Sequence, residues 1–193
     1  MARPREFDTD AVLDAAMCAF WRQGYEATSM ADLVAATGLQ KGSLYKAFSD
    51  KHTLFIRALQ RYLEQANRFN QQLLSQLDAP KVGVQHWFQT LVESYGTYAD
   101  HRGCFSVNCL IELAPHDDEV RQILAAQTVY LRSLLTQAIA HGQTVGDFRT
   151  DMEAEDLSMM LLSLLYGIVT SSKGGVPIEQ LQKQIRVAIA LME

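Results

Sequence analysis

The segment Thr37–Phe55, TGLQKGSLYKAFSDKHTLF, concentrates side chains that form hydrogen bonds with nucleic acid. Leu39 and Leu44 would hold a short helix against a core, and the remaining side chains would face outward. A glutamine amide pairs with adenine, a lysine reaches guanine or phosphate, and hydroxyl groups bind phosphate oxygens. A glycine lets the backbone approach closely. The candidates for contact with DNA are Gln40, Lys41, Gly42, Ser43, Tyr45 and Lys46.

Phosphate contacts would come from a few placed cations, because the N-terminal part is not basic as a whole. The chain of 193 residues has a net charge of -5 at pH 7, and its first 55 residues hold slightly more Asp and Glu than Lys and Arg. A DNA-binding domain that relied on bulk charge would be basic. We therefore expect contacts from Arg3 and Arg5 in a leading arm, and from Lys51 beside the free amides of a helix start.

These residues must be positioned by helices, since apolar residues recur at spacings of three and four almost throughout. The sequence predicts an all-α protein of about nine helices. We expect a helix-turn-helix domain over residues 1–50 and a ligand-binding and dimerisation domain over residues 51–193. In the first, helices would run from the N-cap Asp8 to Gly24, from Thr28 or Ser29 to Ala35, and from Leu39 to Phe48. In the second, they would cover about 51–77, 82–99, 107–113, 118–141, 153–172 and 178–192.

The first 55 residues resemble the DNA-binding head of TetR-type transcriptional regulators. The resemblance rests on Phe20, Gly24, Tyr25, Thr28, Ser29, Met30, Ala35 or Ala36, Gly38, Gly42, Ser43, Leu44, Tyr45, Phe48, Lys51 and Leu54. It implies that Thr28 and Tyr45 contact phosphates, that residues 40–46 read base edges and that Lys51 anchors the following helix. Gln40 and Ala47 depart from the usual family residues, which affects the operator sequence rather than the binding role.

The resemblance also implies a homodimer joined through the last two helices. The segment 157–172 is apolar almost all round, which favours a dimer seam, although a central core helix is an alternative. Two-fold symmetry would then present two reading helices to a palindromic operator. The predicted interface residues are Met160, Leu161, Leu164, Gly167, Ile168, Leu181, Ile185 and Ala188.

Aromatic residues with a few polar neighbours in the middle of the chain suit a small-molecule cavity. Core packing alone also explains aromatics at helical spacing. Glu112 stands among apolar residues, where a buried carboxylate would bind a ligand, but an exposed turn is the alternative. The candidate ligand contacts are Trp87, Tyr95, Tyr98, Phe105, Asn108, Glu112 and Tyr130.

Cys104 follows His101, Arg102 and Gly103 at an expected helix start, a setting that favours the thiolate. The stretch RGCFSVNCLIELAPHDDEV also resembles a TetR branch that includes electrophile and oxidant sensors. A thiol-based sensor is therefore one alternative, and an inert buried thiol is the other. The three cysteines show no CxxC pair or zinc spacing, so we expect neither a disulfide framework nor a metal or other cofactor.

Other function classes find less support. The five histidines are scattered, and no GxSxG, HExxH or glycine-rich phosphate loop occurs, which argues against an enzyme. A helical protein-binding module without DNA activity would leave Tyr45, Lys51 and the glycine turn unexplained. No apolar run is long enough to span a membrane. We expect a cytoplasmic repressor that binds duplex DNA and responds to a small-molecule effector.

Overall fold

The computed structural model describes residues 7–75, 79–96 and 102–193, so Arg3, Arg5 and Tyr98 lie outside the described residues. The described residues form nine α-helices and no strand, which confirms the predicted all-α class. None of these helices is long and apolar enough to cross a membrane. The helices are α1 Thr9–Gln23, α2 Met30–Thr37, α3 Lys41–Phe48, α4 Lys51–Leu74, α5 Pro80–Gly96, α6 Phe105–Glu112, α7 Asp118–Val145, α8 Ala154–Lys173 and α9 Ile178–Ala190.

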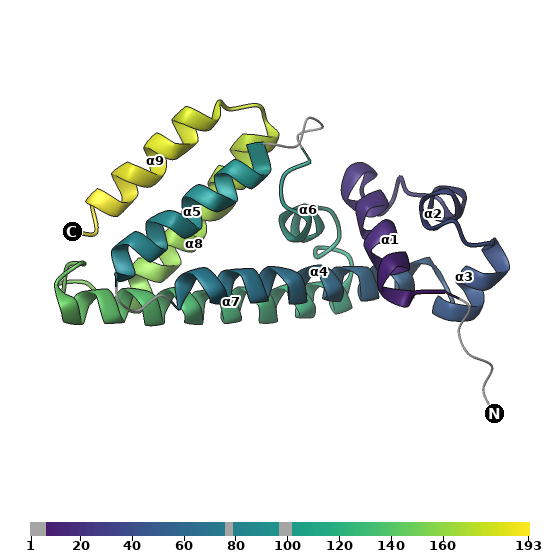
Figure 1. The fold of residues 1–193 in the computed structure, drawn as a ribbon, viewed down its shortest axis with the longest axis horizontal. Helices are drawn as coiled ribbons and strands as arrows, with labels where there is room; N and C mark the ends of the chain where they lie inside the picture. The colour runs from purple at the N-terminus through teal and green to yellow at the C-terminus, as the bar shows by residue number, and fades with distance from the viewer. Residues whose placement is uncertain (1–6, 76–78, 97–101) are drawn as a thin grey trace.

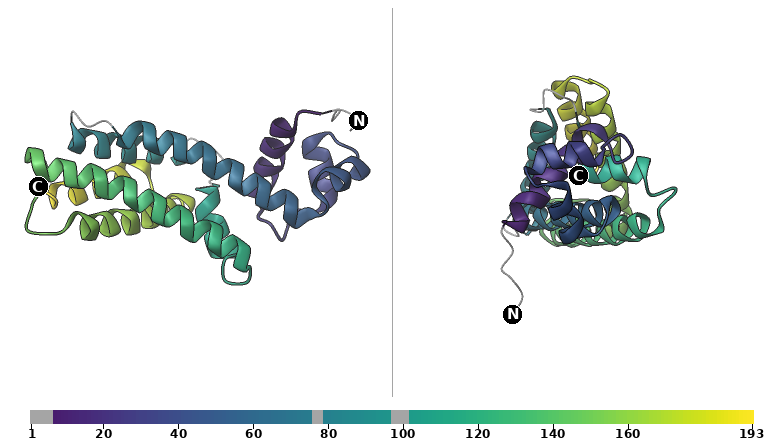
Figure 2. Two further views of the ribbon diagram at one scale, coloured as in Figure 1. Left: turned by 90° about the horizontal axis from the view of Figure 1, so that it is seen from below. Right: turned by 90° about the vertical axis from the view of Figure 1, so that its right-hand side faces the viewer.

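The molecule is elongated, with α1, α2 and α3 forming a head at one end (Figure 1). The long helices α4 and α7 run side by side from the head to the opposite end, as the left view of Figure 2 shows. Helices α5 and α8 pack on them away from the head, α9 packs on α5 and α8, and α6 lies between the head and these helices. With 24 residues, α4 is roughly 36 Å long, so it connects the two ends directly.

Side-chain caps begin four of the helices, at or next to the starts that the sequence predicts. The carboxylates of Asp8, Asp50 and Asp117 accept hydrogen bonds from backbone amides in the first turns of α1, α4 and α7. Ser29 and Asp32 form a reciprocal capping box at the start of α2. Each cap satisfies amides that have no partner inside the helix, which fixes where the helix begins.

Some boundaries differ from those expected. Helix α7 continues through Gly142 to Val145, because this glycine provides close packing instead of ending the helix. A Cβ atom at Gly142 would lie 2.3 Å from the Phe148 ring. Helix α5 already begins at Pro80, a residue suited to a first turn, and α6 begins at Phe105, two residues before the expected start.

The buried apolar residues form two clusters. One fills the head and extends along α4 to Leu63, and it also includes Phe105 and Cys109 of α6. The other lies among α5, α7, α8 and α9. The packing is continuous across residue 50, so the predicted boundary marks a change of helix and not a gap in the core.

Candidate nucleic-acid interface and ligand cavity

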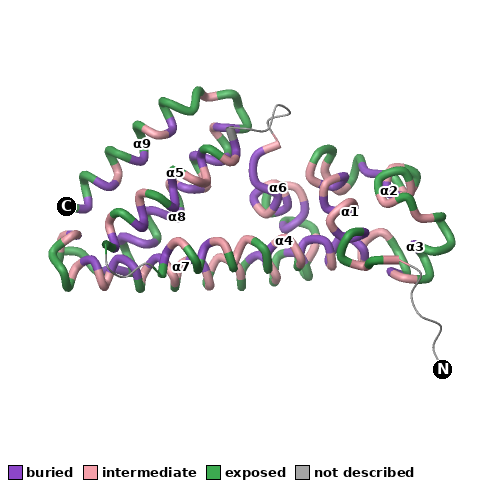
Figure 3. Tube along the Cα trace, viewed as in Figure 1, coloured by how far each residue is buried: buried purple, intermediate pink, exposed green. Residues whose placement is uncertain are grey.

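Helix α3 presents a polar surface at the outer end of the head. Leu44 and Phe48 are buried and hold the helix against the head core. Figure 3 shows exposed residues along the opposite side. Tyr45 is 41% exposed, and the space around Gly42 is open to a distance of 4 Å from an added Cβ. The exposed set consists of Gln40, Lys41, Gly42, Ser43, Tyr45 and Lys46, as the sequence predicts for a surface that could contact DNA.

The turn before α3 gives the head its helix-turn-helix geometry. Gly38 adopts a left-handed conformation with φ of 69°, and its amide donates to the Val34 carbonyl to close α2. A glycine adopts this conformation without steric cost. The chain then turns directly into α3, which packs on α2, so the two helices form a helix-turn-helix.

Lys51 and Thr28 occupy different environments. Lys51 is the first residue of α4, and its ammonium lies 4.3 Å from the centroid of the Tyr25 ring. Thr28 is completely buried, and its hydroxyl donates a hydrogen bond of 2.6 Å to the Gly24 carbonyl. The side chain is thus engaged inside the head, and the phosphate contact expected of Thr28 stays a prediction.

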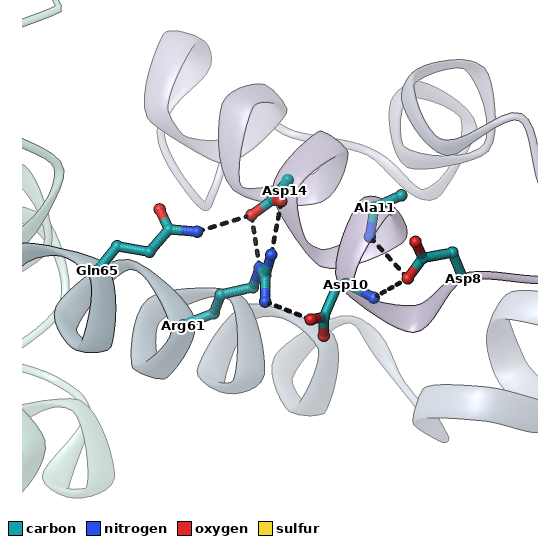
Figure 4. A network of polar contacts seen from close by, with 6 residues as sticks. All are labelled: Asp8, Asp10, Ala11, Asp14, Arg61 and Gln65. Carbon is teal, nitrogen blue, oxygen red and sulfur yellow. Dashed lines mark hydrogen bonds and ion pairs between the residues drawn. The ribbon is translucent and has the colours of Figure 1, made fainter.

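Most acidic residues of the head are held in caps or ion pairs. Arg61 of α4 donates two hydrogen bonds to Asp14 at 2.6 and 2.8 Å, and it pairs with Asp10 at 2.9 Å (Figure 4). Hydrogen bonding from Arg61 lowers the pKa of Asp14 below its usual value. These contacts fasten α1 to α4 and partly neutralise the charge that made the head appear unsuited to DNA.

Helix α6 is joined to the head by polar contacts at both ends. Before its start, the Gly103 carbonyl accepts from the Trp21 indole at 3.1 Å. At its end, the Glu112 carboxylate accepts from the backbone amide of Glu26 at 3.0 Å and lies against Gly24. Glu112 is absent from the cavity lining, and its role as a ligand contact stays a prediction. It binds the α1–α2 turn of the head.

A cavity of about 290 Å³ lies among α1, α4, α5, α6, α7 and α8. Trp87, Tyr95 and Cys104 line it, as the predicted ligand and sensor roles require. Phe105, Asn108 and Tyr130 are absent from its lining, and their assignment as ligand contacts stays a prediction.

Their actual environments explain this difference. The Phe105 ring packs in the head core, edge-on to the rings of Phe55 and Tyr62. The Asn108 amide donates to the Arg102 carbonyl, and its oxygen accepts from Lys173. Both side chains therefore serve to pack or fasten α6.

The sequence interpretation missed several lining residues. Tyr62 and Phe69 are spaced to lie on one side of α4, and this helical spacing could have revealed them. Trp21 comes from the head, and no local pattern connects it with a cavity formed by helices that follow much later in the chain. Asn70 was also missed because a single asparagine within a long helix has no distinguishing spacing.

Cys104 lies in the cavity wall and is 6% exposed. Its sulfur is 3.2 Å from the Tyr62 hydroxyl and 3.1 Å from the Ser106 hydroxyl. Burial, and secondly the neighbouring Cys104, raise the pKa of Tyr62. Burial likewise raises the pKa of Cys109, which keeps that thiol protonated. The redox role of Cys104 stays a prediction.

The predicted dimer residues fall into two groups. Leu161, Ile168, Leu181 and Ile185 are at most 2% exposed within one chain, and their assignment to an interface stays a prediction. They face the core because α8 and α9 pack on each other and on α5. Met160, Leu164, Gly167 and Ala188 are exposed or half-buried. Leu164 and Ala188 also line a surface groove together with Val187 and Leu191.

The described residues contain no cluster of His, Cys, Asp and Glu that could hold a metal ion.

Two parts of the chain match known families. Residues 12–58 match the bacterial regulatory proteins of the tetR family, and residues 83–187 match the tetracyclin repressor-like C-terminal domain. The two matches cover the head with the start of α4 and most of the remaining helices, respectively.

Relatives and solved structures extend over nearly the whole chain. The HTH-type transcriptional repressor ComR of Escherichia coli is 31% identical over 94% of this chain and 87% of its own length. A cysteine-substituted variant of the TetR family transcriptional regulator CifR, solved with a 26-base-pair operator, is 32% identical with a TM-score of 0.81. That match covers 97% of this chain and 98% of CifR. The chain therefore belongs to the TetR family, whose members are DNA-binding transcriptional regulators and not enzymes.

Proposed function

We propose that the protein is a homodimeric cytoplasmic repressor that binds a palindromic operator through α3 and releases it when a small molecule fills the cavity. The exposed polar surface of α3 is the observation that carries this function, because buried Leu44 and Phe48 fix its orientation. The similarity to ComR, named a repressor, and to CifR, solved with its operator, supports the same role.

The outer surface of α8 and α9 supports the dimer. Met160 is 40% exposed, Val187 53% and Leu191 65%, and the groove beside them has a volume of about 590 Å³. A second copy would cover these apolar side chains, which are costly to leave in water. Two-fold symmetry would place the two α3 helices roughly 34–36 Å apart, one turn of DNA.

Helix α6 offers a route from the cavity to the head. Ser106 and Val107 line the cavity, and Glu112 at the other end of α6 binds the amide of Glu26 in the head. A ligand that shifts α6 would therefore move the α1–α2 turn. Release requires the ligand to bind the DNA-incompetent arrangement more tightly than the competent one.

Fluorescence anisotropy with duplex DNA from the region upstream of the protein's own gene tests the DNA-binding role. Specific binding should weaken steeply as salt rises, because cations on the protein displace condensed counterions. Tyr45→Ala should weaken it at least tenfold, by loss of about 1.4 kcal/mol or more. The control Arg68→Ala removes an exposed cation from the part of α4 beyond the head and should leave affinity unchanged. Equal losses in both variants would contradict α3 as the reading element.

The coupling is tested by Glu112→Ala. This variant loses the hydrogen bond to the head but keeps every residue of the cavity lining. Effector affinity should stay within about twofold, while the effector's ability to lower operator affinity should decrease. If the effector lowers operator affinity equally in Glu112→Ala and in the wild type, the change reaches the head through α4 and not through the Glu112 contact.

A further inference from the structure

The walls of the cavity are uncharged. Among the described residues that line it, none is Asp, Glu, Lys, Arg or His. An ionised ligand would lose its hydration there without gaining an opposite charge, and this is a large unfavourable contribution to binding. The cavity volume of about 290 Å³ also limits the ligand to a small molecule.

The walls are also rich in rings. Aromatic side chains come from α1, α4, α5 and α8, and they enclose the space from several directions. The Trp21 and Tyr62 rings, for example, meet edge to face with centroids 5.4 Å apart. Flat ligands make favourable stacked and edge contacts with such walls. The aromatic residues are Trp21, Tyr62, Phe69, Trp87, Tyr95 and Tyr166.

Asn70 supplies an amide donor in the wall of the cavity. The residue lines the cavity and is 6% exposed, and its Oδ1 accepts a hydrogen bond of 2.9 Å from the Trp87 indole. An indole N–H only donates, so the oxygen of Asn70 must face Trp87. No described residue accepts from the Asn70 Nδ2. Among the described residues, Ser172 Oγ is the one fully buried side-chain oxygen or nitrogen without a partner, so the Asn70 Nδ2 is not enclosed by protein. It is open to the cavity that Asn70 lines and can donate to an acceptor on a ligand.

The other polar residues of the wall are engaged with the protein. The Gln65 amide donates to Asp14, and the Gln127 amide donates to Asn67. The hydroxyl of Thr128 bonds the Leu124 carbonyl and the Tyr166 hydroxyl. The amide of Asn70 therefore stands out as the group that would orient a ligand.

We propose that the effector is an uncharged, planar aromatic molecule that carries a carbonyl-type oxygen accepting from Asn70. Its rings lie among the aromatic walls and touch Trp21, so the DNA-binding head forms one side of the effector site. The Trp21 indole also holds the Gly103 carbonyl before α6, which brings the ligand beside a head contact. The identity of the site as an effector site rests on the proposed function, whereas the ligand chemistry rests on the cavity.

The test uses the full chain and a matched set of probes in isothermal titration calorimetry. Acetylnaphthalene carries both the flat rings and the acceptor, ethylnaphthalene lacks the acceptor, and naphthoate carries a charge. Acetylnaphthalene should bind about three- to tenfold more tightly than ethylnaphthalene, the range expected for one hydrogen bond. Naphthoate should bind at least tenfold more weakly than acetylnaphthalene. Absence of acetylnaphthalene binding, equal affinity for the ethyl compound, or tighter binding of naphthoate would each overturn the proposal.

The variant Asn70→Asp examines the orienting group. An aspartate keeps an oxygen for Trp87 but offers no amide donor, so the preference for the acetyl compound should disappear. The control Gln72→Glu adds the same charge at an exposed position of α4 outside the cavity lining and should keep the preference. A preference that survives in Asn70→Asp would overturn the role of Asn70. If Asn70→Asp does not fold, the wild-type probe series still decides the ligand class.

Measuring operator binding in the absence of any probe separates the proposed ligand class from the proposed repressor role. Failure of the probes with intact operator binding would overturn the ligand class and leave the regulator role standing. Probe binding without specific DNA binding would contradict the proposed repressor while supporting the chemistry of the cavity.

Discussion

The head and the body of this protein use aromatic residues in opposite ways. In the head, Phe20, Tyr25 and Phe55 pack ring against ring, with centroid separations of 4.9 to 5.9 Å. In the body, the rings of Trp87 and Tyr95 stand around a cavity of about 290 Å³. The closely packed core of the head holds α3 in one orientation, whereas the cavity of the body leaves space for a ligand. The difference separates a rigid reading element from a responsive one within one helical chain.

The largest expected effect comes from opening the filled core. Phe20→Ala removes a ring that is 1% exposed and should lower the free energy of unfolding by about 3–5 kcal/mol. Urea denaturation measures this change. The surface variant Tyr45→Ala should change stability by about 0.5 kcal/mol or less. A small effect of Phe20→Ala would contradict a tightly packed head.

Two helical glycines should respond with opposite signs. A Cβ at Gly142 in the body would lie 2.3 Å from the Phe148 ring, so Gly142→Ala should cost about 1–3 kcal/mol. A Cβ at Gly42 in the head meets nothing within 4 Å, so Gly42→Ala should stabilise by about 0.5–1 kcal/mol. Thermal unfolding of both variants measures the signs. Operator affinity should fall in Gly42→Ala alone, if the backbone of α3 approaches DNA closely.

A further modest effect concerns the polar contacts between α1 of the head and α4. Arg61→Ala should cost about 1 kcal/mol at neutral pH, because Arg61 is partly buried and holds Asp14 and Asp10. The folded pKa of Asp14 lies below its unfolded value of about 3.9. This stabilisation is therefore complete above that pH and is lost as the pH falls through the folded pKa.

Unfolding at a series of pH values compares wild type with Arg61→Ala. Their difference in stability should shrink below about pH 4, since protonated Asp14 no longer attracts Arg61. Arg61→Lys retains the charge without the two-pronged geometry and should fall between them. A difference that stays constant down to strong acid would show that packing of the Arg61 stem, rather than its charge, fastens α1 to α4.

Local features of the fold and the head were predictable from sequence. The caps at Asp8, Asp50 and Asp117 use side chains that bond amides only a few residues away, so their positions follow from local chemistry. The outward set on α3 follows from helical spacing around Leu44 and Phe48. Thr28 shows the limit of a resemblance, which gives a residue a role without showing that its side chain is buried.

The surroundings of residues in the body could not be predicted from sequence where they depend on which helix lies opposite. Phe105 and Glu112 were both expected at a ligand, yet one packs in the head core and the other holds the α1–α2 turn. Periodicity shows that a helix has an apolar side, but it does not identify the neighbour. Leu161 and Leu181 illustrate the same limit, because a side that packs inside one chain has the pattern of a dimer interface.

The sequence by itself determined the helical class, the beginnings of several helices and the polar surface of α3, because these depend on residues within a few turns of one another. Only the tertiary structure decided that Trp21 of the head and Asn70 of α4 border one cavity. It also decided that α6 connects this cavity with the head. Such contacts join residues far apart in the chain, and their energies depend on packing that no local pattern contains.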